Sequence, residues 1–176
     1  MLQFYGTVNF PFMENKGLKD NEQQLGAALG APKYFIDTPD LKEGERYAWF
    51  PTRGSSMTDH TPKSIPSGSL VLGRWLKLNS IVDIPLHRPI VVIIDDGGVQ
   101  YCMLKSGCKI KEETHEDGGE GAMLCLRSYN PASWCDDFWM PFSHIKFVFV
   151  VEKVRLPDGK EFVPQQEEVI RKGHTP

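Results

Sequence analysis

A short turn in the first half of the chain carries residue types that could do nucleophilic chemistry. Residues 53–59 read RGSSMTD and set two adjacent serines between Gly54 and Met57. A glycine permits a tight backbone at such a turn, and we expect Met57 to pack inward. A serine hydroxyl is a poor nucleophile until a base removes its proton. The turn therefore needs a base from elsewhere in the fold.

His60 is the nearest candidate base in the sequence, four residues after Ser56. A catalytic serine–histidine pair is normally completed by an acid that orients the imidazole. The sequence offers no matching acid motif, so we do not assign His60 this role.

Two segments in a fixed order carry a family resemblance. The turn at Ser56 and Met57 is followed by residues 65–71, IPSGSLV, and much later by residues 126–131, LRSYNP. They resemble the G-x-S-M … I-x-x-G-D-x-[VL] and L-x-S-x-N-P blocks of the Ser/Lys self-cleaving peptidase domain of LexA, UmuD and phage repressors. The resemblance covers roughly residues 46–155 and places Ser56 at the nucleophile position.

The resemblance implies a lysine base and no metal or cofactor. In that family the lysine stays neutral because burial lowers its pKa, and backbone N–H groups beside the serine hold the oxyanion. Our alignment puts Met103 at the lysine position, with Lys105 two residues further along the same strand face. The two positions are about 7 Å apart, a gap that the side chain and a bulge can span. Ser56 and Lys105 are therefore the implied catalytic residues; alternatively, Lys105 is a solvated strand-end residue and the domain is inactive.

Two further departures from the family pattern concern a turn and the cleaved bond. Gly68-Ser69 stands where the family has Gly-Asp, which we expect to affect a turn hydrogen bond rather than the chemistry.

Family members cut themselves at an Ala-Gly or Cys-Gly bond before the serine, and this chain has neither. Leu25-Gly26 lies at a suitable distance, but both it and Leu29-Gly30 could instead belong to a short helix and its cap.

The rest of the sequence predicts a mainly β fold that would position these residues. Turn-forming residues separate short β-rich runs. One such turn, residues 95–98 (DDGG), is typical of a β-hairpin. Many short strands with few helices favour a barrel-like β domain of the LexA/UmuD type. The predicted strands are 46–51, 69–76, 89–95, 98–105, 122–127 and 144–154.

The chain divides into three predicted parts. Residues 1–45 form an N-terminal arm with a possible short helix at 20–29, residues 46–155 the peptidase domain, and residues 156–176 a charged, exposed tail. LexA-like repressors carry a helix-turn-helix domain before the serine, for which the arm is too short, so UmuD is the closer match. With a net charge of only −3, no direct DNA binding is expected.

Other potential ligands and surfaces have ordinary interpretations. The cysteines, at positions 102, 108, 125 and 135, fit no zinc motif and are expected to be free thiols in a reducing cytoplasm. The acid pairs Asp95-Asp96 and Asp136-Asp137 are expected to be solvated. No apolar run is long enough to cross a membrane. An aromatic group is expected to form core and a homodimer surface, and it comprises Trp134, Phe138, Trp139, Phe142, Phe147 and Phe149.

The resemblance implies a self-cleaving regulator of an SOS or prophage transcriptional response, with its own N-terminal arm as substrate and a possible regulatory protein partner. The alternative is a catalytically inactive β module of the same fold that binds another protein. A signal-peptidase relative, which also uses a serine and a lysine, fits less well because the sequence shows no membrane anchor.

Overall fold

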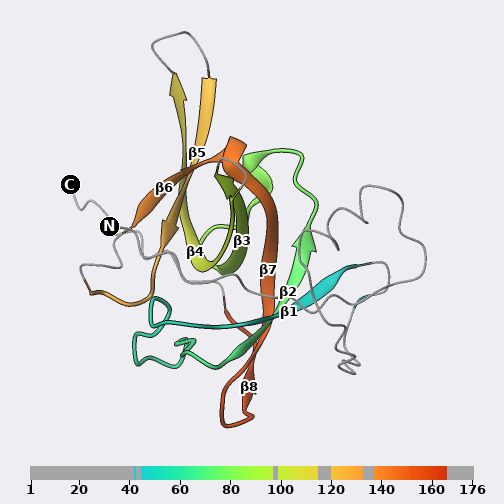
Figure 1. Cartoon of the computed structure of the whole chain (residues 1–176), viewed down its shortest axis with the longest axis vertical. Helices are drawn as coiled ribbons and strands as arrows, with labels where there is room; N and C mark the ends of the chain where they lie inside the picture. The colour runs from blue at the N-terminus through green and yellow to red at the C-terminus, as the bar shows by residue number, and fades with distance from the viewer. Residues whose placement is uncertain (1–41, 43–44, 97–98, 115–119, 133–136, 166–176) are drawn as a thin grey trace, which may run out of the picture.

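The computed structural model describes residues 42, 45–96, 99–114, 120–132 and 137–165, and within them the chain forms one antiparallel sheet. The strand order is β1-β2-β7-β3-β4-β5-β6, and β8 pairs with β7 outside this path (Figure 1). The elements are β1 (Tyr47–Pro51), β2 (Leu70–Leu76), the 3₁₀ turn η1 (Ile81–Asp83), β3 (Pro89–Asp96), β4 (Val99–Thr114), β5 (Glu120–Arg127), β6 (Phe138–Pro141), η3 (Phe142–His144), β7 (Ile145–Arg155) and β8 (Glu161–Phe162).

The prediction of a mainly β fold is confirmed, since no α-helix occurs in the described residues. Strands form at all six predicted places, and the predicted hairpin joins β3 to β4 with Asp96 paired to Val99. The sequence analysis missed the short strands β6 and β8 and the outer half of β4. The predicted helix at 20–29 lies outside the described residues. No helix among the described residues is long and apolar enough to cross a membrane.

The strand β7 joins two parts of the sheet that are separate in the sequence. It pairs with β2 on one side and with β3 on the other, so β7 joins the hairpin β1–β2 to β3–β6 within the sheet (Figure 1). β7 also pairs with β8, which places Phe162, a residue of the predicted C-terminal tail, opposite Val154. The sheet thus continues past residue 155.

Both faces of the sheet are buried at its centre. Alternate side chains of β3 enter two different clusters: Val91 and Ile93 one, Ile90 and Val92 the other. This two-sided burial explains why β3 reads as a continuous apolar run rather than an alternating one. The first cluster, which we call the Met57 cluster, contains Ala48, Phe50, Met57, Ile65, Val71, Val91, Ile93, Phe149, Val151 and Val154. The second, the Leu126 cluster, contains Ile81, Ile84, Ile90, Val92, Ile94, Leu124, Leu126, Ile145 and Val148.

Two strands approach unusually closely at Gly73. The β2–β7 pairing shifts register between Leu72 and Gly73, a sign of a bulge. A Cβ atom at Gly73 would lie 2.7 Å from the Phe149 Cβ and 2.9 Å from the Phe50 ring. Those two rings pack edge to face with their centroids 4.9 Å apart. Position 73 therefore has no room for a side chain.

Candidate active site

The loop that carries Ser56 is tied together at its base. Thr52 N and Oγ1 donate to Ser69 O at 2.8 and 3.1 Å, and Gly68 N donates to Thr52 O at 3.0 Å. Ser69 itself is fully buried, and its hydroxyl has no hydrogen-bond partner in the structure. These bonds bring the end of β1 against the start of β2 and leave residues 53–67 as one closed loop.

Ser56 lies at a chain reversal within this loop. Gly54 has φ +79°, a left-handed conformation that favours glycine, and Thr58 N donates to Ser55 O at 3.0 Å. Met57 is 3% exposed within the Met57 cluster, so the prediction that it packs inward is confirmed. Ile65 N donates to Met57 O at 2.8 Å. The buried methionine anchors the reversal, while Ser56 is half-buried beside it.

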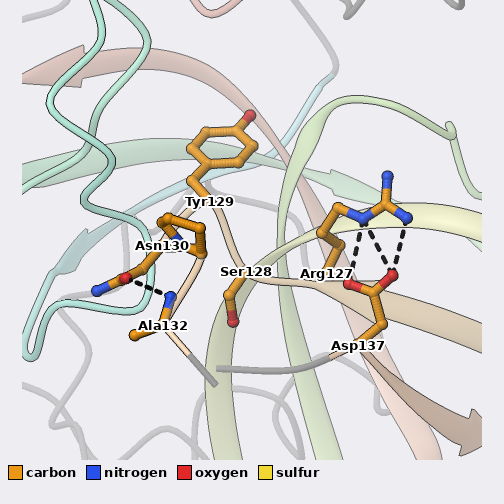
Figure 2. A pocket seen from close by; sticks show the side chains of 7 residues that line it. Arg127, Ser128, Tyr129, Asn130, Ala132 and Asp137 are labelled. Carbon is orange, nitrogen blue, oxygen red and sulfur yellow. Dashed lines mark hydrogen bonds and ion pairs between the residues drawn. The ribbon is translucent and has the colours of Figure 1, made fainter. Parts of the chain in front are cut away.

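The second motif segment is hydrogen-bonded to this reversal. Asn130 N donates to Ser56 O at 3.0 Å, and Asn130 Nδ2 donates to Ser55 O at 3.1 Å. The Asn130 side chain is itself oriented because its Oδ1 accepts from Ala132 N at 2.9 Å (Figure 2). Two segments more than 70 positions apart in the sequence, which the family resemblance pairs, are therefore in direct contact.

Lys105 reaches the same segment from β4. Its Nζ donates to Ser128 Oγ at 2.7 Å, and it lies 5.9 Å from the centroid of the Phe138 ring. Ser128 is 8% exposed and Lys105 is half-buried. Ser128 is two positions from Asn130, which contacts Ser56, so Lys105 is linked to the Ser56 loop through the segment 128–130. Lys105 itself lies beside Phe138 and the Leu126 cluster, whereas the Ser56 loop packs through Met57 against the other face of the sheet. A direct contact between Lys105 and Ser56 stays a prediction.

Strand alternation explains why Lys105 points toward Ser128. Met103, at the family's lysine position, packs against the Leu126 cluster, whereas Cys102 and Leu104 pack against the Met57 cluster. Lys105 shares the face of Met103 by alternation. Ser128 is two positions after Leu126, so by the same alternation its side chain lies on the face of the Leu126 cluster. Lys105 therefore lies on the same face of β4 as Met103, two positions further along.

An open pocket of about 570 Å³ lies beside Ser128. In Figure 2 the Ser128 side chain and the Tyr129 ring extend to opposite sides of the chain. One side of the pocket is closed by an ion pair: Arg127 Nη2 donates to Asp137 Oδ2 at 2.8 Å, and Arg127 Nε lies 3.1 Å from each carboxylate oxygen. The lining residues are Arg127, Ser128, Tyr129, Asn130, Pro131, Ala132 and Asp137.

Tyr129 and Lys63 connect the pocket to the loop of Ser56. The Tyr129 ring packs against the Met57 cluster, and Lys63 Nζ lies 4.6 Å above the ring centroid. A cation over an aromatic face is attracted by the ring quadrupole. This contact adds a third link between residues 53–67 and residues 127–132.

The expectation of free thiols is wrong for two of the cysteines. Cys108 and Cys125 form a disulfide with a Cα–Cα distance of 5.5 Å. The two sulfur atoms and a carboxylate oxygen of Asp137 lie within 4.8 Å of one another. The bond between the sulfurs accounts for this cluster without a metal. Cys102 is free, and burial raises the pKa of its thiol, which keeps it protonated and unreactive. Cys135 lies outside the described residues.

The other candidates stay away from the site chemistry or lie outside the description. His60 is exposed and has φ +60°. Asp137, which we expected to be solvated, is exposed but pairs with Arg127. Phe149 is in the core, as expected, and Trp139 is 37% exposed. Residues 133–136 and the Leu25-Gly26 bond lie outside the described residues.

The sequence analysis missed the role of Ser128. The signal was present, because Ser128 is the serine of the quoted 126–131 segment. Its pairing with a lysine 23 positions earlier depends on the β4–β5 register. No protein-family model, curated protein or solved structure matches the chain, so the resemblance rests on the quoted residues and on the geometry around them.

Proposed function

We propose that the described domain is a LexA/UmuD-like Ser/Lys peptidase domain that cleaves its own N-terminal arm, as a regulator of an SOS or prophage transcriptional response. The observation that carries this proposal is the 2.7 Å hydrogen bond from Lys105 Nζ to Ser128 Oγ, in a segment that is fastened to Ser56 by Asn130. A lysine amine as base and a serine hydroxyl as nucleophile are the groups that metal-free acyl transfer requires.

The proposed roles follow from the chemistry of each group. Neutral Lys105 takes the proton of Ser56 Oγ as that oxygen attacks the carbonyl carbon of the scissile peptide bond. The lysine then gives the proton to the leaving amine, and water hydrolyses the resulting ester of Ser56. Ser128 holds the lysine amine by the described hydrogen bond. Donors to the oxyanion would be backbone N–H groups at the Gly54–Met57 reversal.

The direct test is self-cleavage of the purified full chain, followed by intact mass spectrometry from pH 7 to about pH 10. We expect a shortened product whose rate of formation rises with pH, because only the neutral amine can accept the serine proton. Ser56→Ala and Lys105→Ala should each lower the rate by at least about 10³-fold. Ser128→Ala should lower it by about 10²-fold, because the amine loses the hydrogen bond that orients it toward residue 128.

Matched controls separate chemistry from folding. Ser67→Ala removes an exposed serine of the same loop, and Lys109→Ala removes an exposed lysine of the same strand. Both should cleave like the wild type. Cleavage that survives Ser56→Ala but not Ser128→Ala would show that the hydroxyl bonded to Lys105 is the nucleophile. Absence of cleavage at every pH in a folded chain would overturn the peptidase proposal.

The alternative is an inactive module of the same fold that binds another protein. The observation in its favour is that Met103 occupies the family's lysine position and packs into the Leu126 cluster. Met103→Lys in the wild-type background distinguishes the two. If it creates pH-dependent self-cleavage where the wild type has none, the fold is retained and the natural domain is inactive.

We also propose that the chain forms a homodimer. Trp139 is 37% exposed on the edge strand β6, and Lys111 Nζ lies 4.6 Å above its ring. An edge strand with an exposed aromatic offers both backbone and apolar contacts to a second copy. Light scattering at tens of micromolar should give twice the 19.9 kDa chain mass. A monomer mass there, or a dimer unaffected by Trp139→Ser, contradicts this interface.

A further inference from the structure

The disulfide between Cys108 and Cys125 lies at an irregularity next to the candidate site. The β4–β5 register pairs Gly107 with Leu126 and Lys109 with Cys125, so Cys108 is the extra residue of a bulge. A bulge leaves its extra residue without a ladder partner and disrupts the pairing locally. The disulfide joins this extra residue covalently to the opposite strand.

The disulfide and the bulge lie close to the residues that make the Lys105–Ser128 pair. Beyond the bulge, Gly107 pairs with Leu126 and Ser106 with Arg127, and Lys105 and Ser128 flank this last pair. The hydrogen bond between Lys105 and Ser128 therefore depends on the register that β4 and β5 hold at this point. A strand shift of one residue would turn Lys105 to the other face of the sheet.

Two non-covalent interactions also hold the chain near this bulge. His87 N donates to Gly107 O at 2.6 Å, which uses a carbonyl of the bulged strand. On the outer side, the Arg127–Asp137 ion pair is exposed and is therefore worth little on its own. Cys108 and Cys125 are each 3% exposed, so the disulfide is buried, unlike the ion pair.

We propose that the Cys108–Cys125 disulfide is a redox-sensitive positioning element that fixes Lys105 on Ser128. Reduction by a thiol converts the bond into two cysteine thiols while two molecules of the reductant become one disulfide. The bulge is then held only by non-covalent contacts, and the lysine amine leaves Ser128 more often. That this also changes self-cleavage rests on the proposed function; the effect on the amine does not.

The test measures the amine directly. Purified chain is prepared oxidised, or reduced with a phosphine, and each sample is acetylated briefly with a small amine-reactive ester. Site-resolved mass spectrometry then compares Lys105 with Lys77 and Lys146, two exposed lysines outside β4 and β5. We expect Lys105 to react at least about threefold faster after reduction, the population change that loss of one hydrogen bond produces. Lys77 and Lys146 should be unchanged.

Variants assign the effect to this disulfide. The double variant Cys108→Ser/Cys125→Ser should show the fast Lys105 reaction in both redox conditions, and Cys102→Ser should keep the wild-type difference. Amide hydrogen exchange over residues 104–110 should rise in the reduced chain, which reports the bulge even if the double variant folds poorly. Equal Lys105 rates and equal exchange in both states, or two free thiols at these positions in the air-purified chain, would overturn the proposal.

The same preparations distinguish this inference from the peptidase proposal. If self-cleavage is absent but Lys105 reactivity responds to reduction, the positioning role holds and the peptidase proposal fails. If self-cleavage occurs at equal rates in both redox states while Lys105 reactivity is also equal, the disulfide is purely structural.

Discussion

Asn130 is the residue through which two distant segments meet. Its backbone and side chain donate to two consecutive carbonyls, those of Ser55 and Ser56, while its own side-chain oxygen accepts from Ala132. A side-chain amide is suited to this position because it offers a donor and an acceptor at once. A carboxylate or a hydrocarbon side chain can fulfil at most one of the two roles.

We therefore expect Asn130→Asp to be more harmful than Asn130→Ala. The aspartate keeps the acceptor for Ala132 N but sets a second acceptor against Ser55 O, whereas alanine only removes the bond. Urea unfolding should show a loss of about 1–3 kcal/mol for Asn130→Asp, and about 1 kcal/mol for Asn130→Ala. Self-cleavage should fall in the same order. Equal stability of both variants and the wild type would show that the Asn130 side-chain hydrogen bonds do not stabilise the fold.

At the scale of residues, the inward packing of Met57 could be predicted from the sequence, because it follows from the local motif. The catalytic roles of Ser56 and Lys105 stay predictions. The hydrogen bond from Lys105 to Ser128 could not be predicted, because it depends on a register set by a bulge at Cys108. The disulfide was missed for the same reason: its cysteines face each other only once that register is known.

At the scale of elements, the strands that were missed or cut short are those with little apolar burial. The outer part of β4 alternates Lys109, Ile110, Lys111 and Glu112, a pattern that reads as a solvated segment. Beyond Ser106 this strand pairs only with β5, and the two form a ribbon that projects from the sheet (Figure 1). Strands of two to four residues, such as β8 and β6, leave no periodic pattern to detect.

The close approach of β2 and β7 at Gly73 makes a prediction about stability. Gly73→Ala places a methyl group against Phe149 and Phe50, both of which are buried, so neighbouring strands must move apart. Overpacking of this kind costs about 1–3 kcal/mol. Thermal unfolding should show a lower midpoint for Gly73→Ala. As a control, Val163→Ala at a 63% exposed position should change stability by less than about 0.5 kcal/mol. An unchanged midpoint for Gly73→Ala would contradict the described packing.

At the scale of the whole molecule, exposed carboxyl groups that accept hydrogen bonds predict how stability responds to acid. Backbone N–H groups of Asn79 and Ser80 lower the pKa of Asp83, and hydrogen bonding to Arg155, chiefly, lowers the pKa of Glu161. A carboxyl group with a lowered pKa in the folded state adds stability above its unfolded pKa. That contribution is lost as the pH falls through the folded value.

Stability should therefore be constant near neutral pH and fall below about pH 4.5. The measurement is urea unfolding between pH 3 and pH 7. Asp83→Asn and Glu161→Gln should each flatten the acid limb, because the substituted group no longer binds a proton on unfolding. Parallel acid limbs for the wild type and both variants would show that these carboxyl groups keep the same pKa in the folded and unfolded chain.

The place of β7 in the sheet has a consequence for a chain that is still being synthesised. Ser56 leaves the ribosome early, but its hairpin joins β3 and β4 in one sheet only after Ile145–Arg155 is available to pair between β2 and β3. At about 5–20 residues per second, the roughly 100 residues from Ser56 to Arg155 take about 5–20 s. During that interval the hairpin that carries Ser56 and the strands that carry Lys105 lack the strand that joins them in the sheet. The strand order thus delays completion of the sheet until β7 has been synthesised.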